Sequence, residues 1–254
     1  MASYFITGGT RGIGLGIATA LMSKPSSEVA KVFATGRKSN PNLDKLIQES
    51  SGRVEFVSVE VTNQESVKSA VATIEKSLGD KGLDVLINSA GILNVTPEGV
   101  DKITDLESTF AVNVVGTQNV TTAFLPLLRK GTQKKVFNVT STMASNGMSS
   151  YFKMQPAPAY KVSKAAVNML TTQYAEAFAD EGFTFIAICP GCTDRNQWVK
   201  TDLGSQAADL TVEQSANGIV EQSEKITAKD SGKFLSIKVE GWEERGYHGG
   251  ERPF

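Results

Sequence analysis

The sequence predicts an α/β protein with a doubly wound, mainly parallel sheet of seven strands and helices on both faces. Two observations carry this prediction. Short apolar runs, typical of strands, alternate along the chain with longer segments in which apolar residues recur at helical intervals. In addition, the first strand-like run ends in a cluster of glycines that opens a helical pattern, the arrangement of a strand–turn–helix unit.

The strand-like runs are expected in order at 4–7, 29–35, 53–59, 83–88, 135–140, 183–189 and 233–237. Helical patterns lie between them at 13–22, 43–49, 66–78, 106–128, 159–179 and 212–226. Because parallel strands need crossover connections, this alternation predicts helices on both faces of one sheet. No repeat or linker divides the chain, so one domain over 1–254 is expected. The polar, glycine-rich tail at 238–254 predicts no element and is expected to be a loop or a substrate-side cover.

Composition excludes several classes of protein. Lys and Arg total 26 and Asp and Glu total 27, and this balance argues against nucleic acid or an anionic membrane as the main partner. No apolar stretch approaches the ~20 residues that span a bilayer, and the N-terminus enters a strand at once, so we expect no leader and a cytoplasmic protein. Two cysteines and one histidine, His248, argue against a disulfide scaffold, a histidine-rich metal site and a histidine triad, so no metal is expected.

The glycine cluster after the first strand indicates a phosphate-binding loop. Glycines allow a tight turn and close approach of the backbone to a pyrophosphate, and the following helix offers backbone N–H groups and a positive dipole end. A purely structural turn is the alternative, but the strand–glycine–helix context favours nucleotide binding. The candidate contacts are Gly8, Thr10, Arg11, Gly12, Ile13 and Gly14.

Six landmarks together resemble the short-chain dehydrogenase/reductase family. They are the spacing Gly8, Gly12, Gly14, the turn Asn88-Ser89-Ala90-Gly91, Asn113, Ser141, the Tyr160-x-x-x-Lys164 pair and Pro190-Gly191. They occur in the order of the family over residues 3 to about 237, and the stretch WVKTDLG at 198–204 looks most like the sniffer, C-factor and norsolorinic acid ketoreductase branch of carbonyl reductases. The resemblance implies a Rossmann-type fold, a nicotinamide cofactor, a carbonyl or alcohol substrate and a homodimer or homotetramer built on the two long helices.

The residues after the second strand indicate which nicotinamide cofactor binds. An acidic side chain there accepts from a ribose hydroxyl, whereas a basic one accommodates a 2′-phosphate. This chain has Arg37 and Lys38 and no carboxylate, with Arg11 close by in the glycine loop, so we expect NADP(H) rather than NAD(H). A solvated basic turn is the alternative. The resemblance adds contacts from Glu60, Val61, Asn88, Ala90, Gly91, Tyr160, Lys164, Pro190 and Gly191.

Tyr160 and Lys164 stand four residues apart, so both project from one face of a helix. A tyrosine with a pKa of ~10 needs about 4 kcal/mol of phenolate stabilisation to act near pH 7, and a neighbouring ammonium contributes to it. Tyr160 is therefore the candidate acid–base and Lys164 the group that lowers its pKa. Ser141 is expected to polarise the carbonyl, with Thr140 as the alternative if the strand is shifted by one. By resemblance, Asn113 holds a water in the proton relay.

Two departures from the family pattern stand out. The stretch between Ser141 and Tyr160 is unusually long, and its apolar residues predict either an aromatic or lipophilic substrate, or packing on the body or a subunit. The second departure is an insertion, CTDRNQ at 192–197, which leaves open whether Thr193 or Thr201 meets the cofactor. It also creates a Cys189-x-x-Cys192 pair, whose redox role is disfavoured because no redox-type helix begins there.

The leading functional prediction is an NADPH-dependent carbonyl reductase. A dehydratase or epimerase on the same scaffold is the alternative among enzymes, since a fold alone does not fix function. A binding protein that senses the nucleotide without turnover is the alternative from another class.

Overall fold

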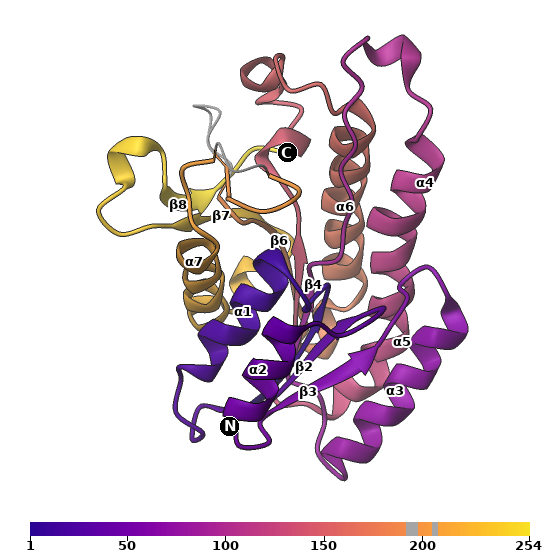
Figure 1. The fold of residues 1–254 in the computed structure, drawn as a ribbon, viewed down its shortest axis with the longest axis vertical. Coiled ribbons are helices and arrows are strands. Elements are labelled where there is room, and N and C mark those ends of the chain that lie inside the picture. The colour runs from indigo at the N-terminus through magenta and orange to yellow at the C-terminus, as the bar shows by residue number, and fades with distance from the viewer. Residues whose placement is uncertain (192–197, 205–207) are drawn as a thin grey trace.

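The computed structural model describes residues 1–191, 198–204 and 208–254, and its centre is one twisted sheet (Figure 1). Its strands run in the order β3-β2-β1-β4-β5-β6-β7-β8, and every neighbouring pair is parallel except β7 and β8. This confirms the doubly wound, mainly parallel sheet. The strands are β1 (Ala2–Thr7), β2 (Val29–Gly36), β3 (Val54–Ser58), β4 (Val85–Asn88), β5 (Lys135–Val139), β6 (Thr184–Cys189), β7 (Phe234–Lys238) and β8 (His248–Glu251).

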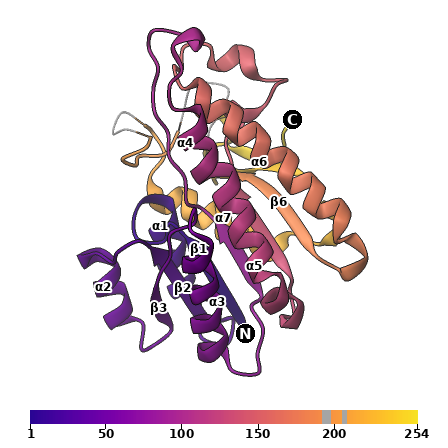
Figure 2. The same cartoon turned by 90° about the vertical axis from the view of Figure 1, so that its right-hand side faces the viewer.

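Helices cover both faces of the sheet (Figures 1 and 2). The elements α1 (Gly12–Met22), α2 (Pro41–Glu49) and α7 (Val212–Lys225) contribute to one apolar cluster, and α3 (Gln64–Leu78), α5 (Gly116–Lys130) and α6 (Pro158–Ala177) to the other. Alternate residues of one strand enter opposite clusters, as Ile6 and Phe5 of β1 do. Strands buried on both faces explain why their sequences are apolar without alternation.

The tail at 238–254 departs from the expectation. It contains the eighth strand, β8, which pairs antiparallel with β7 at the edge of the sheet. Gly249 and Gly250 there have φ of 73° and 92°, a conformation that glycine adopts without steric cost. Beyond β8, the chain reaches the segment after β5: the Gly147 N–H donates to the Phe254 carbonyl at 3.2 Å, and the Phe254 ring lies 5.8 Å from that of Phe234.

The long helical segment expected at 106–128 is divided. It comprises α4 (Leu106–Phe110), a π-helical turn (Ala111–Val115) and α5. The π turn holds Asn113, whose side chain is fully buried. Such turns are rare and often occur at functional sites. This π turn was not predicted from the sequence, because the apolar spacing on either side of such a turn remains nearly helical.

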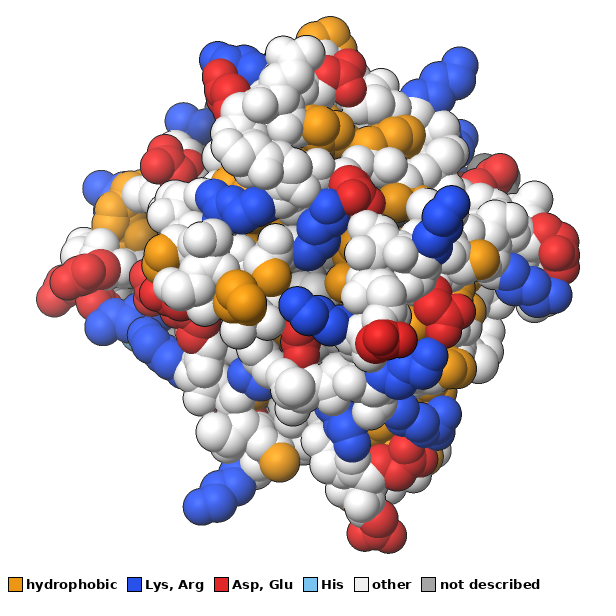
Figure 3. All heavy atoms as spheres, turned by 90° about the horizontal axis from the view of Figure 1, so that it is seen from below, with side chains coloured by type: hydrophobic (Ala, Val, Ile, Leu, Met, Phe, Trp, Pro, Cys, Tyr) orange, Lys and Arg blue, Asp and Glu red, His pale blue; other side chains and the backbone are white. Residues whose placement is uncertain are grey.

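Charged residues of both signs are interspersed over the face shown in Figure 3, in keeping with the net charge of −1. Among the described residues, no helix has the combination of length and apolar character that crossing a bilayer requires. In the same ranges, no three residues of the types His, Cys, Asp and Glu gather as a metal site would need.

Candidate active site

The glycine loop between β1 and α1 packs backbone against backbone. Gly8 and Gly12 have φ of 67° and 53°. A Cβ on Gly8 would lie 3.0 Å from the Ala90 Cα, and one on Gly14 would lie 2.3 Å from the Gly8 carbonyl oxygen, so larger residues do not fit at either position. Within the described chain, Arg11, which caps α1, makes no side-chain capping bond. The loop therefore presents the start of a long helix to the space beside it, an arrangement suited to a phosphate.

That space is a cavity of about 940 Å³ at the carboxyl ends of the strands. All six candidate residues of the glycine loop line it, as do Arg37, Glu60, Val61, Ala90, Gly91, Tyr160, Lys164, Pro190 and Thr201. Four of the candidate site residues that the structure describes are not part of this lining: Asn88, Asn113, Ser141 and Gly191. Thr193 and Cys192 lie outside the described residues, so the structure places only Thr201 of the two candidate threonines.

Arg37 and Lys38 form an exposed basic corner of the cavity, directly after β2. The corner is joined to the glycine loop through Asn40. This side chain donates to the Thr10 carbonyl oxygen and accepts from the Leu43 N–H at 3.0 Å, which caps α2. The arrangement fixes the loop, the basic corner and α2 relative to one another. Its positive charge is suited to an anionic group.

The turn after β4 supports the floor of the cavity. The Thr7 hydroxyl accepts from the N–H groups of Ser89 and Ala90, both at 3.0 Å. Asn88 points elsewhere: it is buried, and its side-chain amide donates to the Thr121 hydroxyl at 2.9 Å and to the side-chain oxygen of Asn138 at 2.8 Å. Its place in the structure is beneath the cavity, tying β4 to β5 and α5.

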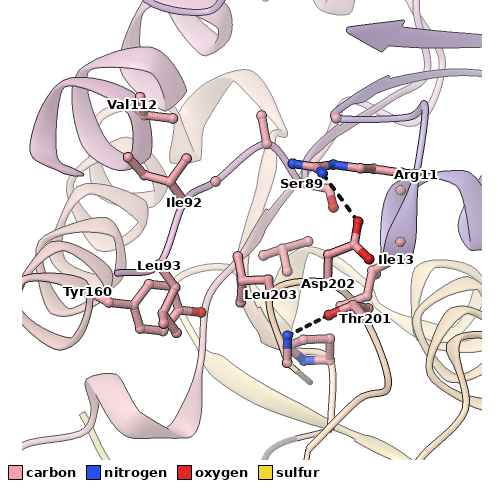
Figure 4. A pocket seen from close by; sticks show the side chains of 18 of the residues that line it. Arg11, Ile13, Ser89, Ile92, Leu93, Val112, Tyr160, Thr201, Asp202 and Leu203 are labelled. Carbon is pink, nitrogen blue, oxygen red and sulfur yellow. Dashed lines mark hydrogen bonds and ion pairs between the residues drawn. The ribbon is translucent and has the colours of Figure 1, made fainter. Parts of the chain in front are cut away.

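Tyr160 and Lys164 enter the cavity from the first turns of α6. Figure 4 shows the Tyr160 ring on one wall, with Arg11 and Asp202 on the far side. Lys164 Nζ lies 5.8 Å from the Tyr160 ring centroid and donates to the Val139 carbonyl oxygen at 2.8 Å. Burial lowers the pKa of Lys164 to about 8, because removal from water disfavours the ammonium. A lysine with this pKa is still mostly charged at pH 7.

Asn113 and Lys164 both lie next to Gly91. Its oxygen accepts from the Ile92 N–H at 2.9 Å, and its amide nitrogen donates to the Ile92 carbonyl and to the Ser163 hydroxyl, both at 3.0 Å. A Cβ on Gly91 would be 3.2 Å from the Asn113 oxygen and 3.5 Å from Lys164 Nζ. Glycine at position 91 thus leaves room where the asparagine and the lysine approach each other.

Ser141 and Thr140 follow β5 with different surroundings. Ser141 is fully buried, and its hydroxyl accepts from the Met143 N–H at 3.2 Å, capping a short 3₁₀ helix (Thr142–Ala144). Thr140 lines the cavity, and its hydroxyl lies 3.3 Å from the Lys164 carbonyl oxygen, to which it donates. Ser141 and Thr140, the two candidates for the hydrogen bond to the substrate oxygen, both lie within two residues of Val139, whose carbonyl accepts from Lys164.

The segment 198–204 crosses the cavity opposite Tyr160. A Cβ on Gly12 would lie 3.5 Å from Thr201 Cγ2, so this threonine sits against the glycine loop. Arg11 pairs with Asp202 at 3.2 Å, and the Thr201 hydroxyl accepts from the Gly204 N–H at 2.8 Å, as the dashed lines of Figure 4 show. The segment is anchored behind by the Lys200 N–H, which donates to the Leu210 carbonyl at 2.8 Å.

The long stretch before α6 contributes only some of its apolar side chains to the cavity. Met143 and Phe152 line it, whereas Tyr151 and Met154 are 53% and 85% exposed. Met148 is buried elsewhere. The prediction that this stretch borders the candidate site therefore holds for Met143 and Phe152, and Pro156 and Ala157 of the same stretch line the cavity as well.

Sequence reasoning missed several residues. The anchor of Lys164 is a backbone carbonyl, for which no side-chain signal exists. Ser163, which binds Asn113, stands inside the Tyr-x-x-x-Lys motif and was within reach of helical spacing. Asp202 and Gln155 both line the cavity. They belong to loops that only the folded chain brings to the cavity.

Comparison with known proteins agrees with this geometry. The family model for short chain dehydrogenases matches residues 3–206. A short-chain dehydrogenase/reductase, AacuF of Aspergillus aculeatus, is 36% identical over 205 residues, which cover 77% of this chain and 75% of that protein.

Two solved structures are similar over nearly the whole chain. The NADPH-bound carbonyl reductase from chicken fatty liver has a TM-score of 0.83 and 31% identity, covering 95% of this chain and 94% of the other. The carbonyl reductase Sniffer of D. melanogaster has a TM-score of 0.86 and 27% identity, with all of both chains covered. The glycine loop, the Tyr160–Lys164 pair and these matches lead to one conclusion: the chain belongs to the short-chain dehydrogenase family of oxidoreductases.

Proposed function

We propose that the protein is an NADP(H)-dependent carbonyl reductase that interconverts a carbonyl compound and a secondary alcohol. The observation that carries the proposal is the pairing of the Tyr160 ring with the buried Lys164 ammonium in the cavity that also holds the glycine loop. A phenol beside a cation is suited to giving a proton to a carbonyl oxygen and to taking it back.

The residues around the cavity fit a dinucleotide with a 2′-phosphate. Glycines without space for a Cβ form the pyrophosphate cradle, and the corner of Arg37 and Lys38 offers two cations and no carboxylate. Arg11 is a third cation at this end of the cavity, and Thr201 lies against Gly12, where a hydroxyl is suited to a diphosphate oxygen. Val61 and Glu60 would border the adenine. When bound, the reduced cofactor supplies the hydride, with NADPH bound in the chicken relative.

The chain's own residues would manage the proton. In the direction of reduction, the carbonyl carbon gains a hydride and the carbonyl oxygen gains the phenolic proton of Tyr160, which gives the alcohol and a phenolate. The Lys164 ammonium stabilises that phenolate by its charge, and Ser141 donates a hydrogen bond to the substrate oxygen while negative charge develops on it. Asn113, next to Lys164, would hold a water through which Lys164 exchanges the proton that restores the phenol with solvent.

The test is direct turnover. The purified protein is mixed with NADPH and a panel of aldehydes, ketones and quinones, and loss of the nicotinamide absorbance is followed. We expect consumption with at least one class of lipophilic carbonyl compound, and a slower rate with NADH. Tight NADPH binding without turnover on any compound would instead indicate a binding protein that senses the nucleotide.

We further propose that residues 1–254 act as one domain and associate through α4 to α6. Large apolar side chains in this part of the chain are exposed: Val115 of the π turn to 48%, and Val162 and Met169 of α6 to 49% and 61%. Exposed apolar groups on neighbouring helices are typical of interfaces. A mass measured in solution at micromolar concentration should be that of a dimer or tetramer, and a monomeric mass would exclude the association.

A further inference from the structure

The connection between β7 and β8 carries a large, fully buried tyrosine, Tyr247, which the mechanism described above does not use. Its carbonyl accepts from the Val239 N–H at 2.9 Å, next to the last paired residues of the two strands. Its ring meets that of Trp242 edge-on, with the centroids 5.8 Å apart. Backbone pairing and ring packing therefore fix the direction in which the hydroxyl of this tyrosine points.

The Tyr247 hydroxyl donates to Oδ1 of Asp209 at 3.0 Å. The second carboxylate oxygen, Oδ2, is buried and accepts no hydrogen bond within the described part of the chain. A carboxylate that is removed from water needs hydrogen-bond partners, and a hydrogen bond to an ionised group is stronger than one between neutral groups. Among the residues that the structure describes, the hydroxyl of Tyr247 is the one donor to this side chain.

Asp209 is followed by Leu210, whose backbone pairs with the segment 198–204. The Leu210 N–H donates to the Trp198 carbonyl at 3.2 Å, and the Leu210 carbonyl accepts from the Lys200 N–H at 2.8 Å. Leu210 is itself fully buried. The bond to Asp209 is therefore one residue away from the backbone bonds that hold the segment 198–204 from behind.

The front of the same segment meets the glycine loop (Figure 4). A Cβ on Gly12 would lie 3.5 Å from Thr201 Cγ2, and Arg11 pairs with Asp202 at 3.2 Å. Both side chains of this ion pair are more than 70% exposed (75% and 78%), and an exposed ion pair contributes little to stability. The buried bonds behind the segment are thus a stronger hold on Thr201 than the ion pair in front of it.

We propose that Tyr247 is a positioning residue for the nucleotide: through Asp209 it holds the segment 198–204 against the glycine loop, so that Thr201 is in place before the cofactor binds. The assignment rests on the proposed NADP(H)-dependent function. A segment that is ordered in advance loses less entropy when a ligand binds. Loss of the hydroxyl should therefore weaken the nucleotide and hasten its release.

The experiment uses Tyr247→Phe, Asp209→Ala and the double variant, with Tyr4→Phe as the matched control. Tyr4 is also a buried tyrosine (4% exposed), its hydroxyl bonds to Ser223, and neither residue lines the cavity. Backbone hydrogen exchange is followed by NMR on the nucleotide-free protein. The dissociation constant and dissociation rate of NADPH are measured by fluorescence, without any carbonyl compound, and the stability of each variant is measured in urea.

We expect Tyr247→Phe to speed exchange of the Lys200 and Leu210 amides by about tenfold and to raise the dissociation constant of NADPH by about the same factor, as expected for one lost hydrogen bond to a charged group. Tyr4→Phe should lower stability without either change. The double variant should lose no more than the weaker-binding single variant, because both substitutions remove the same bond.

Three results would overturn the proposal. The first is unchanged exchange of these amides in Tyr247→Phe, and the second is faster exchange with unchanged affinity for NADPH. The third is a loss in the double variant equal to the sum of the losses in the single variants. If exchange and nucleotide binding follow the expectation but no carbonyl compound is reduced, the assignment of Tyr247 stands and the proposed reductase activity fails.

Discussion

Replacing Lys164 by methionine should change how the stability of the cofactor-free protein depends on pH. Burial lowers the pKa of this lysine to about 8 from the ordinary 10.5. The unfolded chain therefore binds the proton more tightly than the folded one, and the free energy of unfolding rises as the pH increases from about 8 toward 10.5. Below pH 8 the buried ammonium lowers the free energy of unfolding by about 3 kcal/mol.

Methionine has a similar length and cannot ionise, so this cost is absent from the variant at every pH. Between about pH 6.5 and about pH 9.5, the free energy of unfolding of the native protein should therefore rise by about 2 kcal/mol relative to that of the variant. The variant also loses the hydrogen bond to Val139, and this loss changes its free energy of unfolding by an amount that varies little with pH.

The measurement is urea denaturation of both proteins at the two pH values, with Lys153→Met, at an exposed position, as the control. The control should remain parallel to the native protein. A gap between the Lys164 variant and the native protein that stays constant from about pH 6.5 to about pH 9.5 would refute the reasoning, because it would mean that the buried amine is not destabilised as an ammonium.

Three further experiments, with four substitutions, test the proposed site. Tyr160→Phe should lower turnover by ~10²–10⁴-fold with little change in NADPH affinity, since only the acid–base hydroxyl is lost; retention of more than about a tenth of the activity would exclude tyrosine catalysis. Arg37→Asp should weaken NADPH strongly and NADH little, because a carboxylate repels the 2′-phosphate, and equal losses in fluorescence titrations would show that Arg37 does not contact it. Ser141→Ala should lower kcat by ~10²-fold or more while Thr140→Val changes it little; the reverse order would assign the substrate hydrogen bond to Thr140.

The parts of the fold with strong local signals were predictable. Continuous apolar runs indicate buried strands such as β4. The four-residue spacing of Tyr160 and Lys164 is by itself enough to place both on one face of a helix. β8 could not be predicted, because His248–Glu251 has no apolar periodicity and its pairing is determined by the open edge of β7. A strand of this kind depends on its neighbour rather than on its own composition.

The candidate site shows the same division. The residue types and their order along the chain identified the glycine loop, because repeated glycines between a strand and a helix are typical of a phosphate-binding turn. Contacts made across the sheet were out of reach: the burial of Asn88 under the cavity and the inward direction of Gln155, next to the exposed Met154, depend on which segments the fold brings together. Resemblance to a family places Asn88 in the right turn without telling which way its side chain points.

The edge strand β8 also has a practical consequence for labelling. The Arg252 N–H donates to the Phe234 carbonyl at 2.7 Å, and two residues later Phe254 contacts the chain near Gly147, on the stretch that supplies Met143 and Phe152 to the cavity. A bulky group attached at Phe254 would therefore disturb the part of the cavity wall that this stretch forms. A small dye placed there is, for the same reason, well situated to report when a ligand enters.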